Sequence, residues 1–141
     1  MKFLFKIVVP VLALVFVSGC SFVREVNAGR YNENTKTGLA WLSDQFDPAG
    51  INVGGHWTSA DWGEGNLSQS GRNVSGKLGD YDVRGVVSGN QAYLLISEGG
   101  WNYYCAVLES PAPGLLTGHF SRSIPFVKNL ARPMRLEQLA H

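Results

Sequence analysis

Cysteine is scarce in this chain. The 141 residues contain two, Cys20 and Cys105. A framework of several disulfides is therefore excluded, and burial of apolar side chains must hold the fold, which a chain of this length can achieve as one domain. Cys105 lies in an apolar, strand-like run. Because a free cysteine packs as a small hydrophobe, we expect Cys105 to be buried; pairing between molecules is the alternative.

Charge is also scarce. Charged residues make up 16% of the chain, and 12 basic residues face 11 acidic ones, which gives a formal net charge of +1. No basic run occurs anywhere. Nucleic-acid binding depends on clustered positive charge that neutralises phosphates. We therefore expect no nucleic-acid partner.

The sequence shows no pattern typical of a catalytic or metal site. The histidines are His56, His119 and His141, and their spacing is unlike that of metal ligands. Alternation with Trp57 and Phe120 places His56 and His119 on the outer face of their strands. A catalytic triad could assemble only from residues distant in sequence. We expect neither a catalytic residue nor a cofactor, and hence a protein that is not an enzyme.

Long apolar runs are absent except at the N-terminus. There, Lys2 and Lys6 precede an apolar stretch from Ile7 to Val17. A helix that crosses the roughly 30 Å hydrocarbon core needs about 20 apolar residues, so this stretch is too short. A basic start, a short apolar middle and small residues at the exit indicate a cleaved secretory signal. A short membrane anchor is the alternative.

The exit of this segment, Val17-Ser18-Gly19-Cys20, resembles the lipobox of bacterial lipoproteins. The resemblance implies a diacylglyceryl group on the Cys20 thiol, cleavage that removes residues 1–19, and acylation of the new amino group by a chain such as palmitate. Ser21, in place of Asp, resembles the outer-membrane class. The resemblance thus implies a protein anchored by lipid to the outer membrane and facing the periplasm. One acyl chain binds a membrane only marginally, whereas several anchor it stably.

A polar tether and a short helix are expected next. Residues 20–37 are mostly polar and are interpreted as a linker. Residues 38–47 predict a short helix with apolar residues spaced i, i+3, i+7. This apolar stripe consists of Leu39, Leu42 and Phe46. A helix of this length is marginal alone, so we expect it to pack on another element.

From residue 52 to residue 139 the pattern changes to short strands separated by glycine, asparagine and proline. Connections this short join antiparallel neighbours. The predicted strands are 53–59, 65–70, 73–79, 81–88, 91–97, 102–109, 114–121 and 132–139. The fold class is therefore all-β: a small eight-stranded antiparallel up-and-down β-barrel, a meander that closes on itself, preceded by the short helix and the cleaved signal peptide.

Alternation assigns an inner face to three of the strands. The residues expected to face the interior are Val74, Gly76, Leu78, Tyr81, Val83, Gly85, Val87, Leu116, Gly118 and Phe120. The strands at 91–97 and 102–109 are apolar on both faces. The sequence does not assign the inner face of these two strands or of the strand at 132–139. An apolar outer face must be covered. The helix, docked on the wall or across one end, is the first candidate, and a dimer is the second.

Gly55-His56-Trp57 on the first strand resembles the Gly-x-Trp signature of lipocalins and avidin-like relatives in the calycin group. The resemblance covers residues 52–139. It implies that Trp57 packs across the barrel floor against a basic residue from near the last strand, for which Arg132 and Arg135 are candidates. Strands of six to eight residues are shorter than those of lipocalins. They predict an interior largely filled by side chains, with at most a small cavity.

Two functions remain in view. The first is non-enzymatic binding of a small apolar or aromatic ligand at one open end, with Trp57, Tyr81 and Phe120 in the interior or ligand site. Trp62, in a glycine-flanked turn, would form a contact surface or the lid of a cavity. The alternative is a structural or protein-interaction lipoprotein with a filled barrel, or less directly a protease inhibitor. An open apolar cavity of at least about 300 Å³ inside the barrel would favour the ligand binder, and a filled interior with a contiguous exposed apolar patch would favour the interaction protein.

Overall fold

The computed structural model describes residues 28–139. The expected signal peptide, 1–19, and the lipid attachment residue, Cys20, lie outside the described residues. Residues 34–139 belong to one compact unit, and residues 28–33 group with the segment before them. The unit that begins at Asn34 contains the whole barrel.

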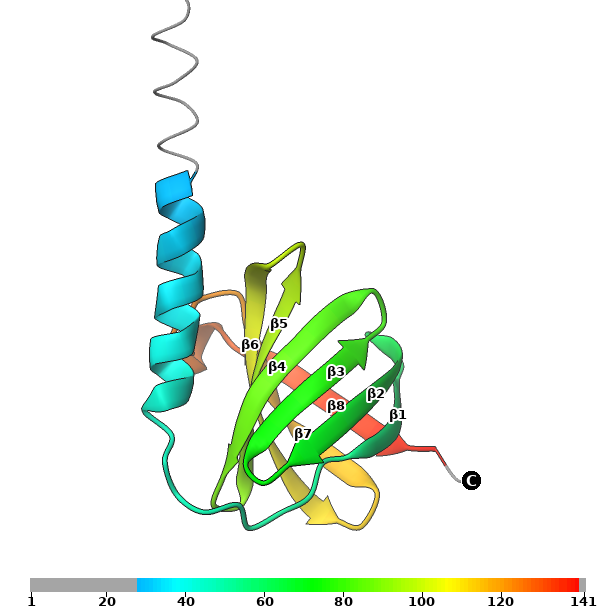
Figure 1. Ribbon diagram of the computed structural model, residues 1–141. Helices are drawn as coiled ribbons and strands as arrows, with labels where there is room; N and C mark the ends of the chain where they lie inside the picture. Colours follow the sequence, from blue (N-terminus) through cyan, green and yellow to red (C-terminus); the bar gives the residue numbers. More distant parts are fainter. Residues whose placement is uncertain (1–27, 140–141) are drawn as a thin grey trace, which may run out of the picture. The chain divides into compact units, whose positions relative to one another are not determined.

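Eight antiparallel strands close into a barrel in chain order, which confirms the predicted fold class (Figure 1). Each strand pairs with the next, and β1 pairs with β8 to close the ring. The strands are β1 (Gly55–Ser59), β2 (Gly63–Ser70), β3 (Asn73–Leu78), β4 (Tyr81–Ser88), β5 (Gln91–Glu98), β6 (Trp101–Ala112), β7 (Leu115–Ser121) and β8 (Arg132–Gln138). Every predicted strand overlaps one of these.

The largest boundary difference is at the end of β6. The strand continues to Ala112, whereas the sequence predicted an end at residue 109. The register shifts between Glu109 and Ala112, and Ala112 then pairs with Leu115. Pro111 is tolerated there because an irregularity in the ladder removes the need for its missing N–H.

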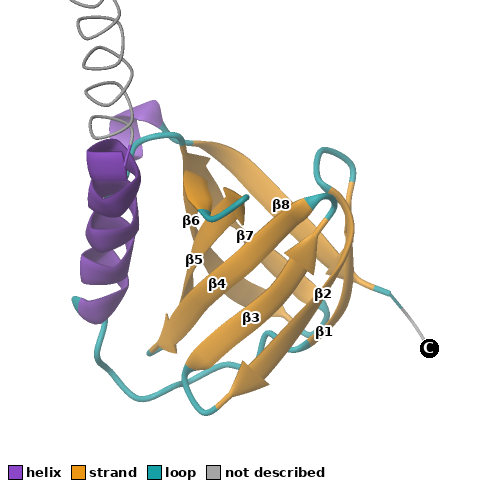
Figure 2. Cartoon of the chain, turned by 45° about the horizontal axis from the view of Figure 1, so that its top comes forward, coloured by secondary structure: helices purple, strands orange, loops and turns teal. Residues whose placement is uncertain are grey.

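The interior of the barrel is filled by one cluster of buried side chains. The strands wrap around this interior (Figure 2). The buried residues show that alternation assigned the inner faces of β3, β4 and β7 correctly, and they settle the inner faces of the other strands. On β5, β6 and β8 the core residues are Ala92, Leu94, Ile96, Ala106, Leu108, Met134 and Leu136. A β-carbon at Gly118 would overlap the carbonyl oxygen of Val107, so glycine there lets β6 and β7 approach closely.

One end of the barrel is closed by the chain that leads into β1. This segment runs past the β4–β5 turn, where the Gly50 N–H donates to the carbonyl of Gly89 at 2.7 Å. The Gln69 side chain accepts from the Val53 N–H at 2.8 Å and donates to the Ile51 carbonyl at 3.0 Å. Val53 is fully buried in the core. We call this the closed end.

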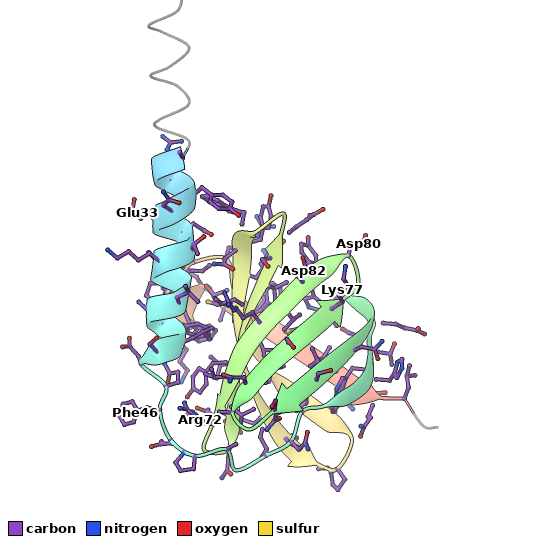
Figure 3. All side chains as sticks on the ribbon, viewed as in Figure 1. Glu33, Phe46, Arg72, Lys77, Asp80 and Asp82 are labelled. Atoms are coloured by element: carbon purple, nitrogen blue, oxygen red, sulfur yellow. The ribbon has the colours of Figure 1, made fainter. Side chains whose placement is uncertain are left out.

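Arg72 adds a further tie at the closed end. It lies in the β2–β3 turn, and its guanidinium donates to the carbonyls of Gln45 and Val87 (Figure 3). The Asp47 N–H donates to the Ser88 hydroxyl at 2.9 Å. These bonds fix the path from the helix to β1 without disulfides.

Trp57 completes the closed end. It is 3% exposed, and its indole N–H donates to the Val53 carbonyl at 2.9 Å. The arginine contact implied by the resemblance is not what the structure shows. Arg135 points outward and pairs with Glu137 at 3.0 Å, and Arg132 lies at the other end of β8, six residues from Gln138, the partner of Trp57.

A helix covers the outer face of β5 and β6, as expected, and it docks on the wall. Trp41 and Leu42 form a second cluster with Leu95 and Cys105. The Trp41 ring meets Tyr93 edge-on, with 5.7 Å between centroids. Leu95 and Cys105 on the outer face of these strands are thereby buried by the same chain, whereas Tyr103 stays 46% exposed.

The bounds and the buried face of the helix differ from the prediction. The helix spans residues 28–43 of the described chain, not 38–47, so part of the predicted tether is helical. Leu39 is 40% exposed and Phe46, beyond the helix end, is 77% exposed and points away from the barrel (Figure 3). Of the predicted stripe, Leu42 alone is buried.

The face that does dock carries Asn34, Gly38, Trp41 and Leu42. A β-carbon at Gly38 would come within 2.6 Å of the Asn102 side-chain nitrogen, so glycine permits close approach of the helix. The Asn102 N–H donates to the Asn34 side-chain oxygen at 2.8 Å, and the Asn34 amide donates back to the Asn102 carbonyl at 3.1 Å. These paired bonds set the position of the helix along β6.

Cys105 lies under this helix and is fully buried, as predicted. Its thiol donates to the Ser123 carbonyl at 3.0 Å, and burial raises its pKa to about 12. We expect iodoacetamide to leave Cys105 unmodified in the folded protein at pH 8 and to label this residue fully in denaturant.

The raised pKa also predicts a pH dependence of stability. The unfolded chain loses the thiol proton above about pH 8.5, whereas the folded protein keeps it to about pH 12. The contribution of Cys105 is therefore complete below pH 8.5 and is lost as the pH rises toward 12. Denaturation curves of wild type and Cys105→Ala should converge over this range. A gap between them that stays constant with pH would contradict the assignment.

Candidate functional site

The end of the barrel opposite Trp57 carries a cluster of aromatic side chains. Trp62 lies in the β1–β2 turn, Tyr81 opens β4, Tyr104 lies on β6 and Phe120 on β7. All four are partly exposed and pack against the top of the core. We call these four residues the aromatic cluster and this end of the barrel the mouth.

The rings of the aromatic cluster meet edge to face around Trp62. Its centroid lies 5.0 Å from that of Phe120, 5.2 Å from that of Tyr104 and 5.7 Å from that of Tyr81. Interplanar angles of 67° to 89° are the geometry that aromatic quadrupoles favour. The cluster is therefore an ordered floor for the mouth.

A hollow of about 780 Å³ opens over this floor. Its volume lies within the range of small-molecule sites, about 300–1,000 Å³. Its lining adds Asp61, Arg122, Ser123, Leu130, Arg132 and Pro133 to the aromatic cluster. This hollow lies outside the barrel interior, which is filled by buried side chains, so the interior cavity that would favour a ligand binder is not found among the described residues.

Polar groups edge the apolar floor. The Arg122 guanidinium carbon lies 6.0 Å from the Tyr104 ring centroid, a cation–π distance. A hydrogen bond to Tyr104 raises the pKa of the Tyr81 hydroxyl, with lesser contributions from neighbours that include Glu98. Tyr81 therefore stays protonated at neutral pH and can donate or accept a hydrogen bond.

Trp62 has an unusual feature. Its indole N–H is buried and has no hydrogen-bond partner in the part of the chain that the structure describes. A buried donor without an acceptor costs about 1–3 kcal/mol. An acceptor brought by a ligand that shifts the Trp62 ring would recover that energy.

Two other hollows lie outside the barrel wall. One of about 940 Å³ lies over the outer faces of β6, β7 and β8, and it contains Phe126 and the paired Arg135 and Glu137. Another of about 520 Å³ lies beside the end of the helix and is mainly polar. Neither gathers several aromatic rings, so the mouth is the better candidate despite its smaller volume than the first.

The structure brings together Trp62, Tyr81 and Phe120, which the sequence singled out separately. It separates Trp57 from them, at the closed end. Sequence reasoning did not assign Tyr104 or Arg122 to the site. Tyr104 was missed because the sequence did not show which face of β6 is the inner one. In the structure Tyr104, Ala106 and Leu108 share that inner face.

Other site residues lie where the alternation placed them. His56 and His119 are exposed on the outer wall, and His141 lies outside the described residues. Between residues 28 and 139 no three His, Cys, Asp or Glu side chains gather closely enough to hold a metal ion. Over the same range, no helix has both the length and the apolar character that crossing a membrane requires.

Comparison of the chain with protein-family models, with curated proteins and with solved structures finds no match.

Proposed function

We propose that this protein is a non-enzymatic binding protein whose mouth accepts a small ligand with an apolar or aromatic body. The observation that carries the proposal is the 780 Å³ hollow floored by the aromatic cluster. A ligand that buries on the order of 200 Å² of apolar surface there would gain about 5 kcal/mol, equivalent to a Kd of roughly 0.2 mM before polar contacts are added.

A protein partner is the second candidate. Leu130 is 65% exposed and Tyr103 is 46% exposed, and both lie beside the aromatic cluster. An apolar side chain of a partner protein could fill the hollow as a small ligand would. If the protein is a protease inhibitor, this partner would be the protease. The filled interior is compatible with this alternative, because both occupants use the mouth and not the barrel core.

We also propose that the Cys20 lipid anchors the protein in the outer membrane. The basic start, the short apolar stretch and the lipobox-like Val17-Ser18-Gly19-Cys20 support this proposal.

The anchor is tested by replacing Cys20 with alanine. We expect Cys20→Ala to leave the membrane fraction and to become extractable without detergent, because the signal would no longer direct lipid attachment. Cys105→Ala is the matched control and should stay membrane-bound. Retention of Cys20→Ala in the detergent fraction would place the anchor elsewhere.

The binding site is tested with N-phenyl-naphthylamine, a neutral aromatic probe whose fluorescence rises in apolar surroundings. We expect the wild type to bind it and Trp62→Ala to bind it at least about tenfold more weakly, since the cluster centres on Trp62. Phe126→Ala, in the outer hollow, is the control and should bind like the wild type. If Phe126→Ala lost probe binding and Trp62→Ala did not, the binding site would be the hollow on the outer wall, which would contradict the proposal.

A further inference from the structure

Two arginines stand at one side of the mouth, and within residues 28–139 neither forms a salt bridge. The salt bridges in this part of the chain join Lys77 to Asp82 and Arg135 to Glu137. Arg122 and Arg132 both line the hollow. Within the described residues, both guanidinium groups are therefore available to a ligand in the hollow.

The fold aims Arg132 at the hollow. It opens β8 opposite Phe120 of the aromatic cluster. It also shares the inward-facing side of the strand with Met134 and Leu136, both of which are buried in the core. Arg132 itself is exposed, at the rim of the barrel where this row of side chains meets the hollow.

Arg122 approaches the same space from the end of β7. It follows the buried Ser121, and its guanidinium lies over the Tyr104 ring. Stacking on an aromatic face holds a guanidinium while leaving its N–H edge free to bind an acid group. The one acid in the lining is Asp61, which makes no salt bridge in the described chain. The hollow thus carries one more positive than negative side chain.

We infer that the ligand of the mouth is an amphipathic anion, with its acid group held by Arg122 and Arg132 and its apolar body on Trp62, Tyr104 and Phe120. The inference rests on the proposed function and adds the chemical class of the ligand. Guanidinium groups bind carboxylate, sulfonate or phosphate through paired, charge-assisted hydrogen bonds, which are roughly twice as strong as neutral ones. The aromatic floor supplies the apolar contact.

The test uses two probes that share one aromatic skeleton. N-phenyl-naphthylamine is neutral, and anilinonaphthalene sulfonate carries a single negative charge. We expect the sulfonate to bind the full-length wild-type protein at least about tenfold more tightly at low salt. Raising the salt concentration should reduce this advantage, because screening weakens partly exposed charge pairs.

The arginines are tested together. In Arg122→Gln/Arg132→Gln the ratio of the two probe affinities should fall to about one, because the two probes share their apolar contacts and differ in the acid group. Arg84→Gln/Arg135→Gln removes two outward arginines and is the matched control for net charge. The control should keep the full advantage. Melting curves of both double variants verify that the fold is retained.

The outcomes separate the inference from the proposed function. Equal affinity for both probes at the mouth would overturn the inference and leave the proposed function standing. Equal loss of the sulfonate advantage in both double variants would show a general charge effect and would overturn the inference. Binding of neither probe would overturn both proposals.

Competition then identifies the apolar part of the ligand. Dodecanoate presents a flexible acyl chain and phenylacetate an aromatic ring, each with one carboxylate. Displacement of the sulfonate probe by dodecanoate supports a lipid-derived acid, and displacement by phenylacetate supports a small aromatic acid. Displacement by neither, at concentrations up to 10 mM or so, would contradict carboxylate or acid-group recognition by the arginines, since Kd values for weak ligands lie near 1 mM at about −4 kcal/mol.

Discussion

Replacement of Trp57 with alanine is expected to lower the free energy of unfolding by about 3–5 kcal/mol, the range for truncation of a large buried aromatic side chain. The side chain is 3% exposed, and its N–H satisfies the Val53 carbonyl at the closed end. The variant loses both the packing and the bond. The total free energy of unfolding of small domains is about 5–15 kcal/mol, so the variant should be close to unfolding at 37 °C.

Urea denaturation followed by circular dichroism measures this change, with two control variants. Trp57→Phe keeps most of the apolar volume but leaves the Val53 carbonyl without its donor, so we expect a loss intermediate between wild type and alanine. Phe46→Ala removes a ring that is 77% exposed and should change stability by less than about 0.5 kcal/mol. Equal effects of Trp57→Ala and Phe46→Ala would contradict the role of Trp57 in closing the barrel.

The second large effect is expected where the helix meets the wall. Trp41→Ala should cost about 3 kcal/mol, because Trp41 is 8% exposed and covers Leu95, Cys105 and Tyr93. It should also expose the Cys105 thiol, so iodoacetamide labelling of the folded variant should be faster than that of the wild type. The two readouts report the same event, loss of the helix from the outer face of β5 and β6.

Leu39→Ala is the control for the helix. The side chain is 40% exposed and one turn or less from Trp41, so its removal tests helix propensity without the docking contact. We expect a loss below about 0.5 kcal/mol and no change in thiol labelling. If Leu39→Ala lowered the free energy of unfolding more than Trp41→Ala, the helix would dock through the apolar stripe that the sequence predicted, which would contradict this structure.

The strands were predictable because their signals are local. Alternation fixed the inner faces of β3, β4 and β7, and glycines with positive φ, such as Gly71 and Gly79, mark turns that few other residues adopt. The helix face was not predictable in this way. Gly38 and Asn34 dock because of Asn102, a residue 68 positions beyond Asn34. The spacing of apolar residues does not identify a glycine that permits close approach, such as Gly38, or an asparagine that forms hydrogen bonds to a strand, such as Asn34.

The candidate site was predictable in part for a related reason. Trp62 stood out in a glycine-flanked turn, and Tyr81 and Phe120 followed from alternation. Tyr104 lies on β6, which is apolar on both faces, and its pairing with β5 shifts register between Ile96 and Ser97. Without that register the sequence could not assign Tyr104 to the interior or the surface. Arg132 was noted for a contact with Trp57, and the length of β8 carries it to the opposite end.

The most direct test of the mouth as the binding site is a titration of the protein with N-phenyl-naphthylamine, followed by the indole N–H signals in a nitrogen–proton correlation spectrum. The chain has four tryptophans, Trp41, Trp57, Trp62 and Trp101, each assignable by substitution. Our account predicts that the Trp62 signal shifts saturably with the probe, whereas the signals of Trp57, at the closed end, and Trp41, under the helix, stay in place. A saturable shift of Trp57 or Trp41 with Trp62 unchanged would contradict it.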